Sequence, residues 1–298
     1  HRPIPVQARS LRGPRYLEVT LRDLRRGRFW RRFFVSGFAT LGVVSSITGI
    51  ASLLVEPLGP DYLWVVFVCV ALAVLIGGFS AWPRPIEQHY ESPATTIRVV
   101  RGDLFEQQTH IVVGTCDTFD IRPPRIAPES VQGLYLSRVY GGDAQALDDA
   151  LRSHLSKLEP VGTLDKLGNT TCYEIGTVVP LEAQRERHFF VAYTQMDEHN
   201  KAHGSPDALW KSLVNLWSSV RQHSNGTALS IPVLGGGQSG LSPVLPSEDA
   251  IRFIALSFMI ASRKSPVCGE LRIVALPELY DRIDHFELQA FLAGLARA

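Results

Sequence analysis

Apolar and polar residues alternate differently before and after residue 84. Two uninterrupted apolar stretches, 33–55 and 62–82, contain no charged residue. A helix needs roughly 20 consecutive apolar residues to cross a bilayer core, so each stretch is long enough to span it. Only the short connector 56–61 separates them, and residues 33–84 are therefore expected to form a transmembrane helical hairpin. A buried core helix, or a signal peptide for the first stretch, explains two full-length stretches less well.

The pattern changes beyond residue 95 to short β-branched runs that alternate with longer amphipathic ones. Strands are predicted at 97–100, 110–114, 172–179, 188–193, 228–233 and 271–275. Helices are predicted at 143–158, 206–223, 246–262 and from 281 to the C-terminus. Strands that alternate with covering helices indicate a layered α/β domain. We expect this domain to occupy 95–298, after a proline-containing linker at 85–94.

Charge divides the chain at the same place. The first 84 residues contain eleven Arg, no Lys and four acidic residues, whereas the remainder is net acidic. Most of these arginines lie in the basic N-terminal arm, 1–32, while the connector 56–61 has two acids and no base. The positive-inside rule then predicts that both termini and the large domain face the cytoplasm, with the connector outside. An acidic domain without a basic stripe argues against a nucleic-acid partner.

The candidate chemistry lies where a predicted strand runs into glycines. The segment 228–233 is followed by a glycine-rich loop at 234–241, with a helix shortly after. Glycines permit positive φ and allow backbone N–H groups to converge on an anion such as a pyrophosphate. No Lys-Ser/Thr pair follows the glycines, so the loop is not a Walker A motif. A tight connection without any ligand is the alternative interpretation.

Two further motifs accompany this loop. Gly102-Asp103-Leu104 follows the first strand of the domain, and Gly114-Thr115-Cys116-Asp117 ends the second. Together with Pro232–Leu241 they resemble the macro domain, an ADP-ribose-binding module of three layers around a mixed sheet. In that family the Gly-Asp-Ile/Leu element holds adenine through its Asp, and the late glycine loop wraps the diphosphate. Asp103 is therefore the expected base-binding residue, although a helix cap would explain it equally well.

One departure from the family pattern concerns Asp117. Many macro domains have an Asn-Ala-Ala-Asn turn here, and Asp117 occupies the place of the Asn that contacts the distal ribose. A carboxylate accepts hydrogen bonds but cannot donate them, so hydrolysis of the kind that the Asn-dependent enzymes perform is not expected. We expect a binding module without catalytic residues, metal or cofactor.

With the hairpin included, the chain resembles the transmembrane macro effectors of type II Thoeris antiphage defence. The resemblance implies that a partner TIR-domain enzyme makes an ADP-ribose derivative, histidine-ADP-ribose, which the macro domain binds. It implies further that bound copies assemble into a homo-oligomer and disrupt the cell's own membrane, an abortive infection response. The alternative is a membrane-tethered ADP-ribosyl hydrolase that acts on modified proteins. In that case Glu198, His199 or His203 could act as general acid or base.

The ligand-binding residues are predicted on the same grounds. Asp117, Phe119, Asp120 and Tyr140 are assigned by their proximity to the first ligand loop. The complete predicted set is Gly102, Asp103, Leu104, Asp117, Phe119, Asp120, Tyr140, Pro232, Leu234, Gly235, Gly236, Gly237, Gln238, Ser239, Gly240 and Leu241.

Overall fold

The chain divides into two compact units, His1–Arg84 and Pro85–Ala298. The computed structural model describes residues 34–35, 37–40, 42, 67–68, 70–76, 85–123, 126–183, 186–236 and 240–296. The basic arm 1–32 and most of the two expected spans, 33–55 and 62–82, lie outside the described residues.

The described residues of His1–Arg84 are all helical and fall within the two expected spans. The two helical segments approach each other at small residues, since a Cβ on Gly37 would lie 3.7 Å from the carbonyl oxygen of Ala73. The large apolar side chains described in this unit are exposed, among them Phe38 and Phe67. Within the described part of the chain, no helix has both the length and the apolarity that a membrane span requires.

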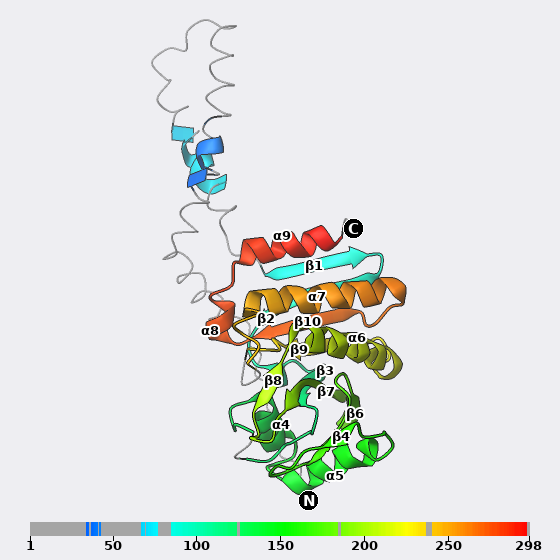
Figure 1. The fold of residues 1–298 in the computed structure, drawn as a ribbon. Helices are drawn as coiled ribbons and strands as arrows, with labels where there is room; N and C mark the ends of the chain where they lie inside the picture. Colours follow the sequence, from blue (N-terminus) through cyan, green and yellow to red (C-terminus); the bar gives the residue numbers. More distant parts are fainter. Residues whose placement is uncertain are drawn as a thin grey trace, which may run out of the picture. The chain divides into compact units, whose positions relative to one another are not determined.

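Pro85–Ala298 is built on a mixed sheet of eight strands (Figure 1). The strand order is β1-β2-β10-β9-β3-β7-β6, and β8 pairs with β7. Neighbours from β2 to β7 in this order run parallel, whereas β1, β6 and β8 are antiparallel to their partners. The strands are β1 (Ile86–Glu91), β2 (Ala94–Arg101), β3 (His110–Cys116), β6 (Val178–Ala183), β7 (Glu186–Met196), β8 (Ala202–Gly204), β9 (Leu229–Pro232) and β10 (Glu270–Ala275). A separate two-stranded sheet pairs β4 (Gly162–Thr163) with β5 (Thr171–Cys172).

Helices cover both faces of the eight-stranded sheet and complete three layers. On one face lie α6 (Pro206–His223), α7 (Ser247–Lys264) and α9 (His285–Leu295) (Figure 1). On the other lie α4 (Val131–Val139) and α5 (Ala144–Leu155). The remaining short helices are the 3₁₀ turn η1 (Leu104–Glu106) and α8 (Pro277–Tyr280). The expected layered α/β domain with a mixed sheet is confirmed.

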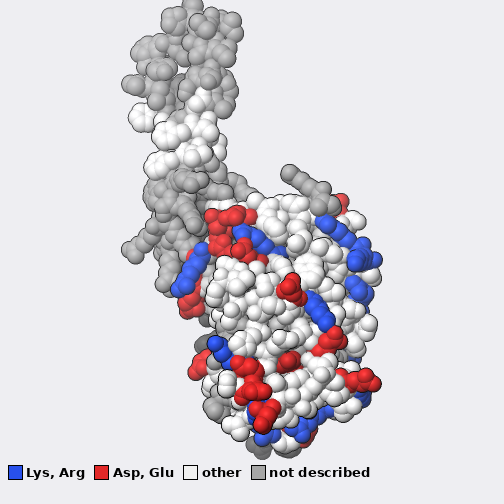
Figure 2. All heavy atoms as spheres, viewed as in Figure 1, with Lys and Arg blue, Asp and Glu red and all other residues white. Residues whose placement is uncertain are grey.

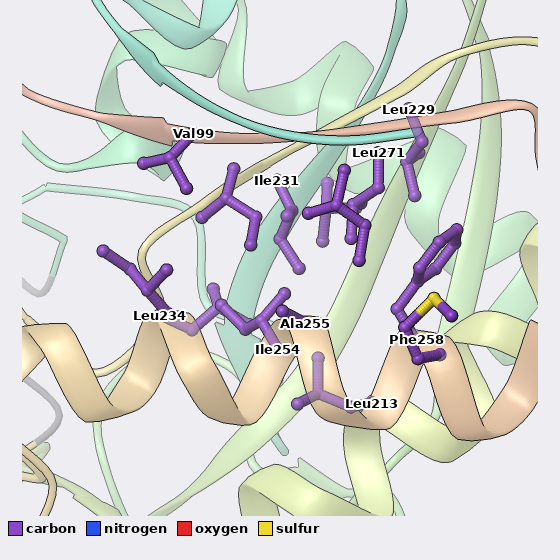
Figure 3. Packing of buried hydrophobic residues seen from close by; sticks show 14 of the residues in the cluster. Val99, Leu213, Leu229, Ile231, Leu234, Ile254, Ala255, Phe258 and Leu271 are labelled. Carbon is purple, nitrogen blue, oxygen red and sulfur yellow. The ribbon is translucent and has the colours of Figure 1, made fainter. Parts of the chain in front are cut away.

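Each face of the sheet has its own hydrophobic core, because successive side chains of a strand point to opposite faces. On β7, Phe189 packs under α6 and α7 whereas Phe190 packs under α4 and α5, and both are fully buried. In Figure 3 the side chains of Ile231 and Leu271 point from the sheet toward Ile254 and Phe258 of α7. Strands that are apolar on both faces are typical of the parallel centre of an α/β domain.

The expectation of a linker at 85–94 is wrong, because this segment contains β1. Ile86 and Tyr90 are 1% and 2% exposed and belong to the core shared with α9. The Tyr90 hydroxyl donates to the Leu292 carbonyl at 2.8 Å. The alternation of β1 is carried by only two apolar residues among charged and polar ones, so the sequence pattern resembled a linker. The domain therefore begins at Pro85.

Candidate ligand-binding site

The order of the strands marks one place in the sheet where neighbouring connections diverge. β3 and β9 are parallel neighbours, yet the chain leaves β3 toward α4 on one face and leaves β9 toward α7 on the other. Their ladder comprises only the pairs His110↔Leu229 and Ile111↔Ser230, so the carboxyl ends of the two strands are not paired with each other. In open α/β sheets, ligands bind outside the carboxyl ends of strands at such a switch point. The candidate site is therefore at the ends of β3 and β9.

The glycine-rich loop begins at this point, directly after β9. Two buried side chains, Leu234 and Leu241, anchor its ends in the core below. Gly235 has φ +94°, and a Cβ there would lie 2.9 Å from Cδ2 of Leu241, so a larger residue would meet both backbone strain and a clash. Gly236 is exposed, and a Cβ there would have no atom closer than 3.7 Å. Gly237, Gln238 and Ser239 lie outside the described residues.

The end of β3 contacts the start of this loop at Gly114. A Cβ on Gly114 would lie 2.9 Å from Cδ2 of Leu234 and 2.6 Å from the ring of Tyr193. Only a residue without a side chain permits β3, β7 and the loop to approach this closely. The structure thus brings together two of the three predicted motifs, the glycine-rich loop and the segment Gly114-Thr115-Cys116-Asp117 at the end of β3.

The third motif, Gly102-Asp103-Leu104, lies at the end of β2. Oδ1 of Asp103 accepts a hydrogen bond from the Phe105 amide at 2.9 Å and caps η1, and Leu104 is buried. Oδ2 accepts from Nη1 of Arg138 at 2.5 Å, and that guanidinium lies 5.3 Å from the centre of the Phe105 ring. The cap suggested by the sequence is present, while base binding by Asp103 stays a prediction. Sequence reasoning missed Arg138, because no local spacing links it to a residue 35 positions earlier.

The turn after β3 places its predicted residues inside the domain. Asp117 is 7% exposed, and its Oδ1 accepts from the Met196 amide at 2.9 Å. Burial raises the pKa of Asp117, an effect opposed by that hydrogen bond. Phe119 is fully buried with φ +51° and meets the ring of Tyr173 edge-on at 5.9 Å. Contacts from either residue to a ligand stay a prediction.

Asp120 takes part in a buried ion pair that the sequence did not indicate. Its Oδ2 lies 2.6 Å from Nζ of Lys166, and the two side chains are 2% and 0% exposed. Its Oδ1 accepts from the Asn169 amide at 3.0 Å. Lys166 comes from the β4–β5 hairpin, 46 residues away, so only the tertiary structure could reveal this pairing.

Tyr140 ends α4 next to a cluster of aromatic rings. Its ring centre lies 5.8 Å from that of Tyr135, and burial raises the pKa of its hydroxyl. The backbone turns sharply after it, because Gly141 and Gly142 have φ +60° and +86°. Asp143 then caps α5 through the amides of Gln145 and Ala146, as expected for an ordinary helix start.

Of the residues suggested for hydrolysis, Glu198 and His199 lie in an exposed turn between β7 and β8, and His203 is exposed on β8. Oδ1 of Asp197 accepts from the amides of His199 and Lys201, and Oδ2 is 2.8 Å from Nε2 of His203. The hydrogen bond from His203 lowers the pKa of Asp197 to about 2. This network fixes the conformation of the turn. Within the described residues, no group of three or more His, Cys, Asp or Glu side chains is placed to hold a metal ion.

Comparisons with known proteins agree with this architecture. The family model "Thoeris protein ThsA, Macro domain" matches residues 97–275. The Thoeris protein ThsA of Bacillus amyloliquefaciens (strain Y2) is 23% identical over 207 residues, which cover 65% of this chain and 67% of the relative.

Among solved structures, a mutant Oceanobacillus iheyensis macrodomain with ADPR aligns with TM-score 0.48 and 14% identity, over 71% of this chain and 100% of that one. The same macrodomain with MES bound aligns with TM-score 0.47 and 14% identity, over 70% and 97%. The family match extends over more than half of the chain and includes β3, β9 and the glycine-rich loop between β9 and β10. The protein therefore belongs to the family of the Thoeris ThsA macro domain.

Proposed function

We propose that this protein is a signal-binding effector of Thoeris antiphage defence, of the type II kind with a membrane anchor. Its macro domain binds an ADP-ribose derivative, histidine-ADP-ribose, made by a partner TIR-domain enzyme. Binding promotes assembly of several copies, and their hairpins then disrupt the inner membrane. The domain acts as a receptor and leaves its ligand unchanged.

The observation that carries this proposal is the position of the glycine-rich loop. It lies at the switch point between β3 and β9, in a chain of the ThsA macro family. Leu234 and Leu241 hold the two ends of the loop in the core, and glycine has no side chain that would obstruct an anion approaching the backbone. A diphosphate is the ligand group best matched to a glycine-rich loop beside a helix start, since Gly236 lies near Ser247 of α7, and both features favour an anion.

Surface properties agree with a small anionic ligand rather than a nucleic acid. On the face of the molecule drawn in Figure 2, acidic and basic side chains of Pro85–Ala298 lie scattered around an extended uncharged area. Nucleic-acid-binding domains concentrate Lys and Arg on one face or stripe. Because the charges on this face are mixed in sign, we expect the affinity for the signal to come mainly from local groups.

Support for the membrane part comes from the described residues of His1–Arg84. Phe38, Phe67 and Leu75 are 67%, 74% and 67% exposed on helical segments. Large apolar side chains exposed to this extent are costly in water, and they favour contact with lipid or with another protein. Together with the uncharged stretches 33–55 and 62–82, it favours insertion of the hairpin into a bilayer.

The substitution Gly236→Glu tests the ligand site. Gly236 is exposed, its φ lies outside the left-handed region, and a Cβ has room, so the fold should tolerate a side chain. The added carboxylate would occupy the proposed diphosphate position and repel its charge. We expect calorimetry with histidine-ADP-ribose to detect binding to the unchanged protein and at least a hundredfold weaker binding, about 3 kcal/mol, to the variant.

Gly294→Glu on α9 is the matched control, because it introduces the same side chain at an exposed helical glycine with no atom within 4 Å. It should bind normally. Equal affinity of Gly236→Glu and Gly294→Glu would reject the loop as the phosphate site. Release of ADP-ribose from modified protein would instead support the hydrolase alternative, and binding without any change of mass in the full chain would reject ligand-driven assembly.

A further inference from the structure

The buried ammonium of Lys166 joins three segments that are distant in the sequence. It donates to Oδ2 of Asp120, in the turn after β3, at 2.6 Å. It also donates to Oδ1 of Asn200, in the turn between β7 and β8, at 3.3 Å. Lys166 itself belongs to the tip of the β4–β5 hairpin, whose neighbouring Leu167 is 75% exposed. A lysine side chain that is fully buried at the tip of an exposed hairpin fixes that tip against the body of the domain.

Further hydrogen bonds connect the same hairpin to the turn after β3. The Asn169 amide donates to Oδ1 of Asp120 at 3.0 Å, and the Asn169 side chain donates to the Phe119 carbonyl at 3.0 Å. The Tyr173 amide, just after β5, donates to the Asp117 carbonyl at 2.9 Å. The turn Asp117–Asp120 is therefore held by groups from the hairpin on several sides.

A buried ion pair of this kind contributes little to the stability of the fold. Two charges lose their hydration in a buried ion pair, and replacement by apolar residues is often neutral or stabilising. Removal of one partner, in contrast, leaves an unpaired buried charge and is strongly destabilising. The pair is better explained by the conformation that it imposes than by a net contribution to the free energy of unfolding.

The conformation that it imposes is strained. Phe119 has φ +51°, a region that residues other than Gly, Asn and Asp seldom adopt, and its ring is fully buried. Backbone strain of this kind persists only where the surroundings determine it, and it gathers at ligand-binding and switch regions. The turn follows Gly114, where β3 contacts the glycine-rich loop through Leu234.

We propose that Lys166 is a positioning residue for ligand recognition, which holds the strained turn Asp117–Asp120 in its binding conformation, shortly after the contact of Gly114 with Leu234 of the glycine-rich loop. This inference rests on the proposed function and adds the β4–β5 hairpin to the site. A preformed turn loses less conformational freedom when the ligand binds. The ion pair of Lys166 with Asp120 should therefore increase the affinity for the ligand.

The test compares the double variant Asp120→Asn with Lys166→Met against Lys211→Met in the full chain. The double variant leaves no buried charge unpaired, and asparagine keeps an oxygen that accepts from the Asn169 amide, so the domain should fold. Lys211 makes an exposed ion pair with Glu174, and the two side chains are 49% and 67% exposed. Lys211→Met therefore removes a lysine from an ion pair that does not hold the turn Asp117–Asp120. Affinity for histidine-ADP-ribose is measured by calorimetry well below the unfolding midpoint, together with hydrogen exchange of the Asn169 and Tyr173 amides.

We expect the double variant to bind at least about tenfold more weakly, with faster exchange at both amides, and Lys211→Met to match the unchanged protein. A purely structural role would lower the unfolding midpoint but leave the affinity of the folded protein unaltered, which would overturn the proposal. The single variant Lys166→Met should be less stable than the double variant. If the unchanged protein binds neither histidine-ADP-ribose nor ADP-ribose, the proposed function itself fails, whereas normal binding by the double variant rejects only the role of Lys166.

Discussion

At the scale of single residues, two buried histidines on β3 and β7 have no place in the proposed binding site. Nδ1 of His110 accepts from the Arg187 amide at 2.8 Å, so its Nε2 carries the proton and donates to the Ser224 carbonyl. Nδ1 of His188 is 2.9 Å from the Tyr135 hydroxyl. Burial, and to a smaller extent the neighbouring His110, lower the pKa of His188 to about 4.

This lowered pKa predicts loss of stability in acid. Between about pH 6.5 and pH 4 the unfolded chain binds a proton at His188 that the folded protein does not bind. The free energy of unfolding therefore decreases as the pH is lowered through this range. The full effect is about 3 kcal/mol, reached below pH 4, and it is absent above pH 6.5. Chemical denaturation of His188→Gln at several pH values in this range should show that its free energy of unfolding depends less steeply on pH. The difference from the unchanged protein should correspond to the uptake of about one proton. An unchanged slope for His188→Gln would contradict the assignment.

The glycines near the site differ in whether the fold has room for a side chain at their position. Gly114 and Gly235 have no room for a Cβ, because Leu234 and Leu241 respectively lie within 2.9 Å of its position. Gly236, between the two anchors, has that room. The sequence alone presents all of these as equivalent glycines, and only the packed neighbours distinguish them.

At the scale of elements, the edge strand β1 is held by a side chain from α9. Oε1 of Gln289 accepts from the Glu87 amide at 3.0 Å, and its Nε2 donates to the Glu87 carbonyl at 2.9 Å. The side-chain amide thus pairs with the free edge of the strand as a further backbone would. Covering an edge in this way protects it from pairing with another chain.

Removal of this amide should loosen β1. Gln289→Ala loses two hydrogen bonds to the backbone, each worth about 1 kcal/mol, although water replaces part of this at a half-exposed site. We expect the free energy of unfolding to fall by about 1 kcal/mol and the Glu87 amide to exchange faster in hydrogen-exchange measurements. Gln145→Ala on α5, whose side chain bonds to the side chains of Arg122 and Asp149, is the control. Equal exchange at Glu87 in both variants would show that Gln289 does not hold the strand.

Elements with local end signals matched their predicted bounds better than elements with tertiary partners. Helix α6 begins after the Ser205 cap with Pro206 at its first turn and ends at His223, as the sequence predicted. The predicted strand 172–179 is instead broken into β5 and β6. Between them Gly176 has φ +93°, and its amide donates to the Ala192 carbonyl of β7. That partner lies outside any local window.

At the scale of the whole molecule, the boundary of the macro domain can be tested by truncation. A fragment 85–298 keeps β1, whereas a fragment 95–298 removes Ile86 and Tyr90 from the core. Each buried side chain of this size contributes roughly 1.5–3 kcal/mol, so the shorter fragment should lose about 3–6 kcal/mol and unfold at much lower denaturant concentration. Similar midpoints for the two fragments would place the boundary after β1. Circular dichroism with urea provides the measurement.

The sequence by itself determined the layered α/β class, most strands and helices, and the location of the glycine-rich loop. These properties depend on the period of apolar residues, on helix caps and on the conformational freedom of glycine, all of which are local. The strand β1, the pairing of Arg138 with Asp103 and the burial of Lys166 against Asp120 were decided only by the tertiary structure. Each depends on the packing of segments far apart in the chain, and no residue carries a local signal of its distant partner.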